Sequence, residues 1–212
     1  MRYIALFVAV CIAWAGVLAA ALARHRVKPA VMDAAFVKIE TDTGHGSGVH
    51  VGRGYVLTAA HVVAGRQSIT VKSETGRVRG AQLLWANDAY DVALLTVPSP
   101  ADLKAAHLAC RDASPGERVS SHGNPLNLEA ISSWGNVARP AAKQSRWANV
   151  FIADLIVDAG MSGGAVLDAA GRLIGLVVGG AGTRTFVGQF VPNGFAFIVP
   201  GSSICHLMGG RA

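Results

Sequence analysis

Short apolar runs follow one another from about residue 35 to residue 200, separated by glycine, asparagine and proline. This spacing is typical of an all-β barrel or sandwich, because each run has the length of one strand and each break has turn-forming residues. The first series of runs is FVKIE (36–40), GVHV (48–51), YVLTAA (55–60), SITVK (68–72), AQLLWA (81–86) and DVALLTV (91–97). The second series is RVSSHG (118–123), AISSWGNVA (130–138), NVFIADLIV (149–157), AVLDAAGRLIGLVV (165–178) and NGFAFIVP (193–200).

A stretch rich in alanine, proline and polar residues, 98–117, divides the two series into halves of similar size. We therefore predict two small β-barrels, at about 35–100 and 117–200. Helical structure is expected only in a turn after His61 and in a short stretch after Pro200, where serines can cap a helix that Gly209-Gly210 would end.

The N-terminus is different, because residues 3–23 are apolar and uncharged. As a helix they would extend for about 30 Å, enough to cross a bilayer. Arg2 and a small-x-small sequence ending at Ala23 fit a cleavable signal peptide, whereas the length of the run fits an uncleaved anchor. We predict that residues 1–23 are one or the other and that residues 24–34 are a juxtamembrane linker. The domain is then membrane-anchored through residues 3–23 or exported.

The charge and the cysteine content of the chain indicate whether it binds nucleic acid or metal and whether it can form a disulfide. The chain carries a net charge of +6, but its basic residues are scattered, so we expect no nucleic-acid partner. Cys11 lies in the apolar segment, which leaves Cys110 and Cys205. The sequence has no CxxC pair, so we expect no metal site, whereas a disulfide between these two cysteines can form in an oxidising compartment.

Three short motifs carry candidate chemistry. YVLTAAHVVAG (55–65) places His61 at the end of a strand, AYDVALLTV (89–97) places Asp91 at the start of another, and DAGMSGGAV (158–166) places Ser162 in a glycine-rich loop. A serine hydroxyl needs a base to become a nucleophile, and a histidine serves when a carboxylate fixes its tautomer. The order His, Asp, Ser is one of those found in serine hydrolases.

TAAHVV, DVALL, GNPL (123–126) and GMSGGAVLDAAGRLIGL together resemble the protease domain of trypsin-like serine proteases, most of all the HtrA (DegP-like) branch. The resemblance covers about residues 35–208. It implies two six-stranded antiparallel β-barrels of the chymotrypsin type, with the active site between them. It also implies a serine endopeptidase that acts on proteins or peptides through an acyl-enzyme and needs no cofactor. We find no match to the PDZ modules of the HtrA branch.

The resemblance assigns further residues to the site. The backbone N–H groups of Gly160 and Ser162 are expected to form the oxyanion hole. The residue at the base of the primary pocket is expected to be Ile156, and the residues beside the substrate backbone Val177, Val178 and Gly179. Because Ile156 is not acidic, we predict a preference for small to medium aliphatic side chains before the scissile bond.

Met161 departs from the family pattern. HtrA-type proteins usually have asparagine there, and trypsin has an aspartate that pairs with a freed N-terminus. Methionine cannot form that pair, so we expect its side chain to pack into the second barrel. Met161 and the missing PDZ module keep an alternative open, a catalytically silent, membrane-associated module that binds peptides or acts as a scaffold.

Overall fold

The computed structural model describes residues 35–209 except residues 187 and 189. The predicted signal or anchor (1–23) and linker (24–34) lie outside the described residues. Among the helices of the described part, none has the length and apolar character needed to cross a membrane.

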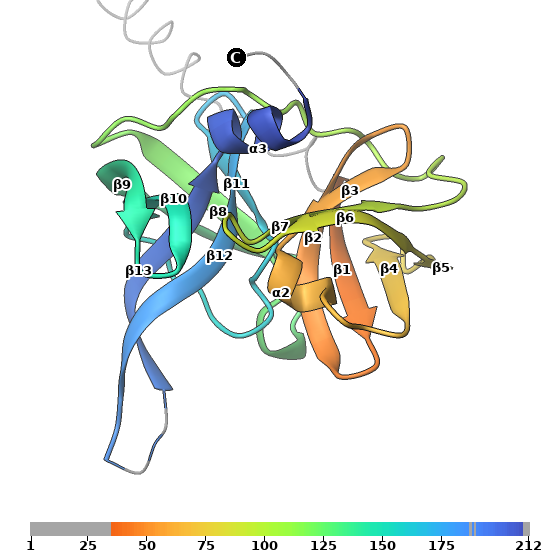
Figure 1. Ribbon diagram of the computed structural model, residues 1–212, viewed down its shortest axis with the longest axis horizontal. Coiled ribbons are helices and arrows are strands. Elements are labelled where there is room, and N and C mark those ends of the chain that lie inside the picture. Colours follow the sequence, from red (N-terminus) through yellow and green to blue (C-terminus); the bar gives the residue numbers. More distant parts are fainter. Residues whose placement is uncertain (1–34, 187, 189, 210–212) are drawn as a thin grey trace, which may run out of the picture. The chain divides into compact units, whose positions relative to one another are not determined.

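The first half of the described chain is a seven-stranded antiparallel sheet with the order β5-β4-β1-β2-β3-β7-β6 (Figure 1). Its strands are β1 (Phe36–Thr41), β2 (Gly44–Gly52), β3 (Tyr55–Thr58), β4 (Ile69–Ser73), β5 (Val78–Gly80), β6 (Gln82–Asn87) and β7 (Val92–Thr96). The two edge strands, β5 and β6, are separated along the chain by Ala81 alone. The sheet therefore has to curl until its edges meet, as in a barrel.

The sequence predicted six strands in this half, and the seventh, β5, was missed. Its pattern is inverted, because Val78 is exposed while Arg79 is buried and paired with Asp102. Burial alone would raise the pKa of Asp102, but hydrogen bonds from Ser73 and Arg79 outweigh it and lower the pKa to about 2. A buried ion pair, invisible to an apolar pattern, thus fixes this edge.

The second half forms a closed six-stranded barrel, as predicted, with the order β10-β13-β12-β11-β8-β9. Its strands are β8 (Arg118–Gly123), β9 (Ile131–Gln144), β10 (Trp147–Ala153), β11 (Ala165–Asp168), β12 (Leu173–Arg184) and β13 (Phe190–Pro200). The far part of the β12–β13 hairpin extends away from the barrel (Figure 1). The described helices are short: α2 (Ala60–Val63), the 3-10 turn η2 (Pro125–Asn127) and α3 (Gly201–Leu207).

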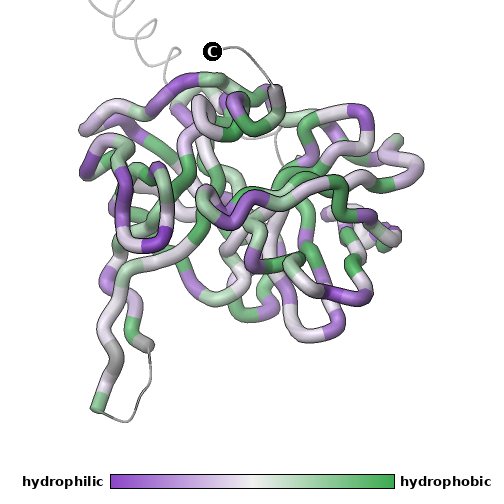
Figure 2. The backbone as a smooth tube through the Cα atoms, viewed as in Figure 1, coloured by the Kyte–Doolittle hydropathy of each residue, from purple (hydrophilic) through white to green (hydrophobic). Residues whose placement is uncertain are grey.

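Apolar side chains are buried in two core clusters, and the larger one joins the first half to residues of the second, such as Leu176 and Val178 of β12. Figure 2 shows apolar residues along the strands and polar residues concentrated in the loops. Ile39, Leu57 and Leu95 are fully buried in one core cluster, and Phe151 and Ile198 in the other. The all-β prediction of two barrels is therefore confirmed.

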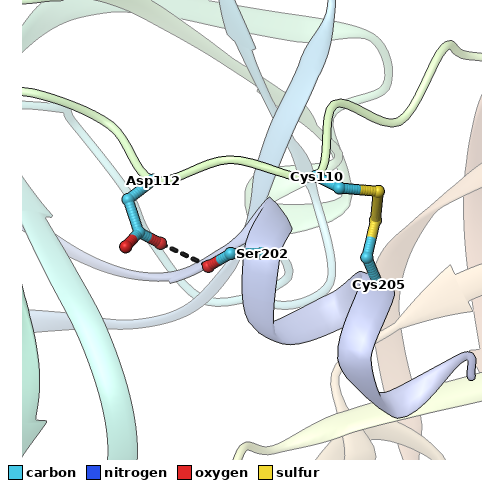
Figure 3. Close-up of a disulfide and its surroundings, with 4 residues drawn as sticks. All are labelled: Cys110, Asp112, Ser202 and Cys205. Carbon is cyan, nitrogen blue, oxygen red and sulfur yellow. Dashed lines mark hydrogen bonds between the residues drawn. A yellow bond between two sulfur atoms is a disulfide. The ribbon is translucent and has the colours of Figure 1, made fainter. Parts of the chain in front are cut away.

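The segment between the barrels is held to the second one. Cys110 forms a disulfide with Cys205 of α3, and the Ser202 hydroxyl donates to Asp112 next to it (Figure 3). The backbone N–H of Ala109 also donates to the carbonyl of Leu173 over 2.8 Å. The disulfide that the cysteine count left open is thus formed, and it anchors the C-terminal helix.

Candidate active site

His61 and Asp91 meet through two hydrogen bonds. His61 lies in α2, directly after β3, and Asp91 immediately precedes β7. The backbone N–H of His61 donates to Asp91 Oδ1 over 2.9 Å, and His61 Nδ1 lies 2.7 Å from Asp91 Oδ2. A carboxylate only accepts, so Nδ1 carries the proton and Nε2 is left as the basic nitrogen. The ring is thereby fixed in the tautomer that a general base requires.

Burial and hydrogen bonds fix both the backbone and the side chain of Asp91. Its side chain is buried and its φ is 57°, a conformation that is uncommon for residues other than glycine. Its own carbonyl accepts from the N–H of Ala60 over 3.1 Å. Burial alone would raise the pKa of the carboxyl, but hydrogen bonds from the ring and backbone of His61 outweigh it, so the pKa is lowered. Asp91 is therefore ionised at neutral pH.

The loop that carries Ser162 is pinned to both barrels. The N–H of Gly163 donates to the carbonyl of Val177 over 2.7 Å, which holds the loop on β12. The N–H of Ser47 in β2 donates to the carbonyl of Ser162 over 2.8 Å, which holds it on the first barrel. Gly46, next to Ser47, lies against both Val62 of α2 and the Ser162 carbonyl. Ser162 therefore lies in the same region of the interface between the barrels as α2.

Three successive carbonyls of this loop are occupied by donors. Ala159 O accepts from the N–H of Leu126, Gly160 O from the Ser47 hydroxyl, and Met161 O from the N–H of Gly164, over 2.7–2.8 Å. Gly160 has a φ of +97°, which glycine adopts without strain. Within the part of the chain that the structure describes, the N–H groups of Gly160 and Ser162 have no acceptor. These are the two donors that the sequence assigned to an oxyanion hole.

Met161 packs into the second barrel, as predicted. Its side chain is 1% exposed and belongs to the core cluster of that barrel. The loop is instead held by Ser47, whose buried hydroxyl donates to Gly160 O and accepts from the N–H of Asn124 over 2.8 Å. Asn124 in turn donates from Nδ2 to Val37 O over 3.1 Å. Ser47 and Asn124 thus orient the loop without a polar side chain at position 161.

The Ser162 hydroxyl is the part of the predicted triad that is not yet engaged. Among the described residues it has no hydrogen-bond partner, whereas His61 and Asp91 are already joined. Such a bond is often long in an enzyme without substrate and tightens when the substrate binds. The geometry therefore combines a histidine held in one tautomer and two unpaired backbone N–H groups with a free serine hydroxyl.

The predicted substrate contacts lie in two different settings, Ile156 at the surface and Val177 and Val178 in the interior. Ile156 is 75% exposed, so its side chain does not form the base of a closed pocket. Val177 and Val178 are buried in the two cores, and the backbone of Val177 is bonded to Gly163 and Gly164 of the nucleophile loop. Burial alternates along the segment that follows β10, where Leu155 and Val157 are buried on either side of Ile156. Val157 rather than Ile156 is therefore the buried residue.

Comparison with known proteins places this geometry in a family. A family model described as a trypsin-like peptidase domain matches residues 46–176. The chain belongs to this family. The match begins before Ser47 and ends after Ser162, so it includes His61 and Asp91 as well.

Two bacterial serine proteases are among the curated relatives of this trypsin-like peptidase. The periplasmic pH-dependent serine endoprotease DegQ of Escherichia coli K12 is 32% identical over 162 residues, covering 72% of this chain and 36% of DegQ. The serine endoprotease DegS of Haemophilus influenzae is 32% identical over 136 residues, covering 62% of this chain and 40% of DegS. This trypsin-like peptidase therefore spans well under half the length of either relative.

Solved structures support the fold. The HtrA-type protease AlgW with a decapeptide has a TM-score of 0.72 at 23% identity, covering 83% of this chain and 63% of AlgW. The inactive form of the Mycobacterium tuberculosis protease Rv3671c has a TM-score of 0.71 at 24% identity, covering 85% of this chain and 91% of that one. Identities this low establish the chymotrypsin-like fold of this trypsin-like peptidase and nothing finer.

Sequence reasoning missed three residues of the site: Ser47, Asn124 and Trp147. Asn124 lies in the GNPL motif, but the motif alone gave it no role. Ser47 lies between two glycines, and its partner Gly160 is 113 positions away. Trp147 reaches Asp91 across 56 positions. Contacts at such separations depend on how the barrels meet, which a local pattern does not encode.

Proposed function

We propose that this chain is a serine endopeptidase that hydrolyses peptide bonds in protein substrates. One observation carries the proposal: a histidine fixed by a buried carboxylate lies beside a serine loop whose two N–H groups are unpaired. The proposed nucleophile is Ser162, the proposed base His61, and the proposed orienting acid Asp91. The relatives, which are named as serine endoproteases, support the same activity.

The proposed reaction follows from these positions. The Ser162 hydroxyl attacks the peptide carbonyl while His61 Nε2 takes its proton, and Asp91 stabilises the imidazolium that forms. The negative oxygen of the tetrahedral intermediate accepts hydrogen bonds from the N–H groups of Gly160 and Ser162. Collapse of the intermediate breaks the C–N bond, and His61 gives its proton to the departing amine. Water then releases the acyl group by the same steps.

We further propose that the enzyme prefers small to medium aliphatic side chains before the scissile bond. Val157 packs against Gly180 of β12, and the part of β12 from Leu173 to Gly180 holds only apolar residues and glycine. A charged side chain placed against this surface would lose water without gaining a partner. Valine, alanine and leucine fit it better than arginine or lysine.

We also propose that the enzyme is exported and works outside the cytoplasm. DegQ is named as a periplasmic protein, and the Cys110–Cys205 disulfide requires an oxidising compartment to persist. The apolar residues 3–23 would serve as the export signal or as a membrane anchor. The proposal does not depend on which of the two they are.

Digestion of unfolded casein by the full-length chain tests the activity. Wild type and Ser114→Ala, which changes an exposed serine, are expected to cleave casein, and Ser162→Ala is expected to leave it intact. A peptide library then tests the specificity, with cleavage expected after valine, alanine or leucine. Casein cleavage that survives in Ser162→Ala would refute the proposal that Ser162 is the nucleophile of a serine endopeptidase. Predominant cleavage after arginine or lysine would refute the proposed preference for aliphatic side chains.

A further inference from the structure

A tryptophan of the second barrel reaches the carboxylate of the first. Trp147 is the first residue of β10 and its side chain is buried. Its indole Nε1 donates to Asp91 Oδ2 over 3.3 Å, the same oxygen that accepts from His61 Nδ1. One carboxylate oxygen therefore links His61, in the first barrel, with Trp147, in the second.

The backbone beside the tryptophan reinforces this contact. The N–H of Ala148 donates to the carbonyl of Ala89 over 2.7 Å, two residues before Asp91. The start of β10 is thus bonded to the turn that delivers Asp91 as well as to the carboxylate itself. Two bonds between the same two segments hold the indole at a fixed position relative to Asp91.

The other side of the indole packs on β12, the strand to which the loop of Ser162 is bonded. A Cβ placed on Gly179 of β12 would lie 3.0 Å from Cη2 and 3.1 Å from Cζ2 of Trp147. The ring of Phe197 in β13 lies 5.0 Å from the indole, tilted by 34°. The indole therefore fills the space between Asp91 and the strand pair β12–β13, and Gly179 leaves room for it.

Two described cationic or ionisable groups face the Asp91 carboxylate. His61 approaches from α2, and Arg146, in the turn before β10, has its Nη2 atom 3.8 Å from Oδ2. The Arg146 guanidinium also lies 4.8 Å from the centre of the Trp147 ring, over its face. Arg146 is largely exposed, so water screens its charge, whereas the buried indole N–H is not screened.

We propose that Trp147 is a positioning residue for the catalytic dyad of His61 and Asp91. The proposal rests on the proposed function. The indole N–H fixes the rotation of the Asp91 carboxylate so that Oδ2 faces His61 Nδ1, and it shares the negative charge of that oxygen. The indole ring couples this carboxylate to β12, the strand that also holds the loop of Ser162. The base and the nucleophile are thereby kept in register across the interface between the barrels.

Trp147→Phe tests this role, because phenylalanine keeps an aromatic ring against Gly179 but lacks the N–H. The rate at which a fluorophosphonate labels Ser162 in the full-length chain is measured against pH. We expect the plateau rate to fall about tenfold, the effect of losing one hydrogen bond to a charged group. We expect the acid limb of this profile to move to higher pH, because without the indole N–H the Asp91 carboxylate stabilises the imidazolium more strongly.

Trp134→Phe is the matched control, since Trp134 is 66% exposed and lies away from these contacts in β9. Its rate and pH profile are expected to equal those of the wild type. A merely structural tryptophan would lower stability in Trp147→Phe without moving the acid limb. A profile of Trp147→Phe identical to that of the wild type would therefore overturn the proposal.

A second measurement separates this proposal from the proposed function. The indole N–H resonances of the ¹⁵N-labelled chain are compared between the wild type and Asp91→Asn. This comparison does not require the protein to be active. We expect the Trp147 resonance to shift and the Trp134 resonance to stay, even if Ser162 proves unreactive. An unshifted Trp147 resonance would refute the contact, whereas a missing reaction with the probe in the wild type would refute the proposed function alone.

Discussion

The replacement of Met161 by asparagine, the residue common in HtrA-type proteins, gives the sharpest test of how the nucleophile loop is held. The sequence alone allows this change to improve the site. The structure predicts the opposite, because Met161 is 1% exposed within the core of the second barrel. Its sulfur lies against Gly123, next to the side chain of Ser47, and its side chain belongs to the apolar core cluster of that barrel.

The expected cost follows from burial. Removing the buried methionine side chain forfeits about 1.5–3 kcal/mol of hydrophobic stabilisation. Burying an amide without partners adds about 1–3 kcal/mol. We therefore expect Met161→Asn to lower the free energy of unfolding by about 3–5 kcal/mol, a large share of the stability of an ordinary domain. Met161→Leu conserves volume and apolarity, so its cost is expected to stay below about 1.5 kcal/mol.

Urea denaturation of the full-length variants measures these changes, and fluorophosphonate labelling under native conditions measures the site. Met208→Asn serves as a control, because Met208 is 38% exposed at the end of α3 and should change stability by no more than about 0.5 kcal/mol. We expect Met161→Asn to label no faster than the wild type per folded molecule. An asparagine variant that is as stable as the wild type and labels faster would refute the assignment of Met161 to the core.

Three further changes probe other parts of the structure. Gly160→Ala places a methyl group against the carbonyl of Asn124 and the imidazole of His45, at a φ of +97° that alanine rarely adopts, so kcat should fall by about 10²–10³. Gly44→Ala is the control, because the space around Gly44 is open, and it should keep full activity. Equal kcat values in the two variants would contradict the oxyanion role of Gly160. The lowered pKa of Asp102 means that its contribution to stability is present above its unfolded pKa and is lost as pH falls to about 2. Urea titrations should therefore show Asp102→Asn less stable than the wild type at about pH 6 and less dependent on pH between about 4 and 2, whereas parallel curves would contradict this. Reduction of the Cys110–Cys205 disulfide, which spans 95 residues, should lower the free energy of unfolding by about 2–5 kcal/mol, as measured by urea titration. An unfolding curve that reductant does not change would contradict the stabilising role of this disulfide.

Sequence and structure agree where the information is local. The motifs around His61, Asp91 and Ser162 identify residues that strands and tight turns present, and apolar runs separated by turn residues identify most strands. Burial of Met161 was also accessible, because methionine is apolar and cannot form the ion pair of the aspartate found at this position in trypsin. These features depend on a few adjacent residues, so a pattern can find them.

The sequence fails where two distant segments must meet. Strand β5 depends on the pairing of Arg79 with Asp102, and the orientation of the nucleophile loop depends on Ser47, in the other barrel. Ile156 was assigned to a pocket by counting back from Ser162, but the buried side chain is that of its neighbour Val157. Each of these outcomes is decided by packing between elements rather than by local preference.

Labelling of the full-length chain with a fluorophosphonate, followed by mass spectrometry of the modified peptide, tests the central claim most directly. The account predicts a single modified serine, Ser162. It also predicts that the rate falls by about a thousandfold or more in His61→Ala and is unchanged in His107→Ala, where an exposed histidine is removed. A folded wild type that does not react, or a rate in His61→Ala equal to that of the wild type, would contradict the claim that these residues form a working protease site.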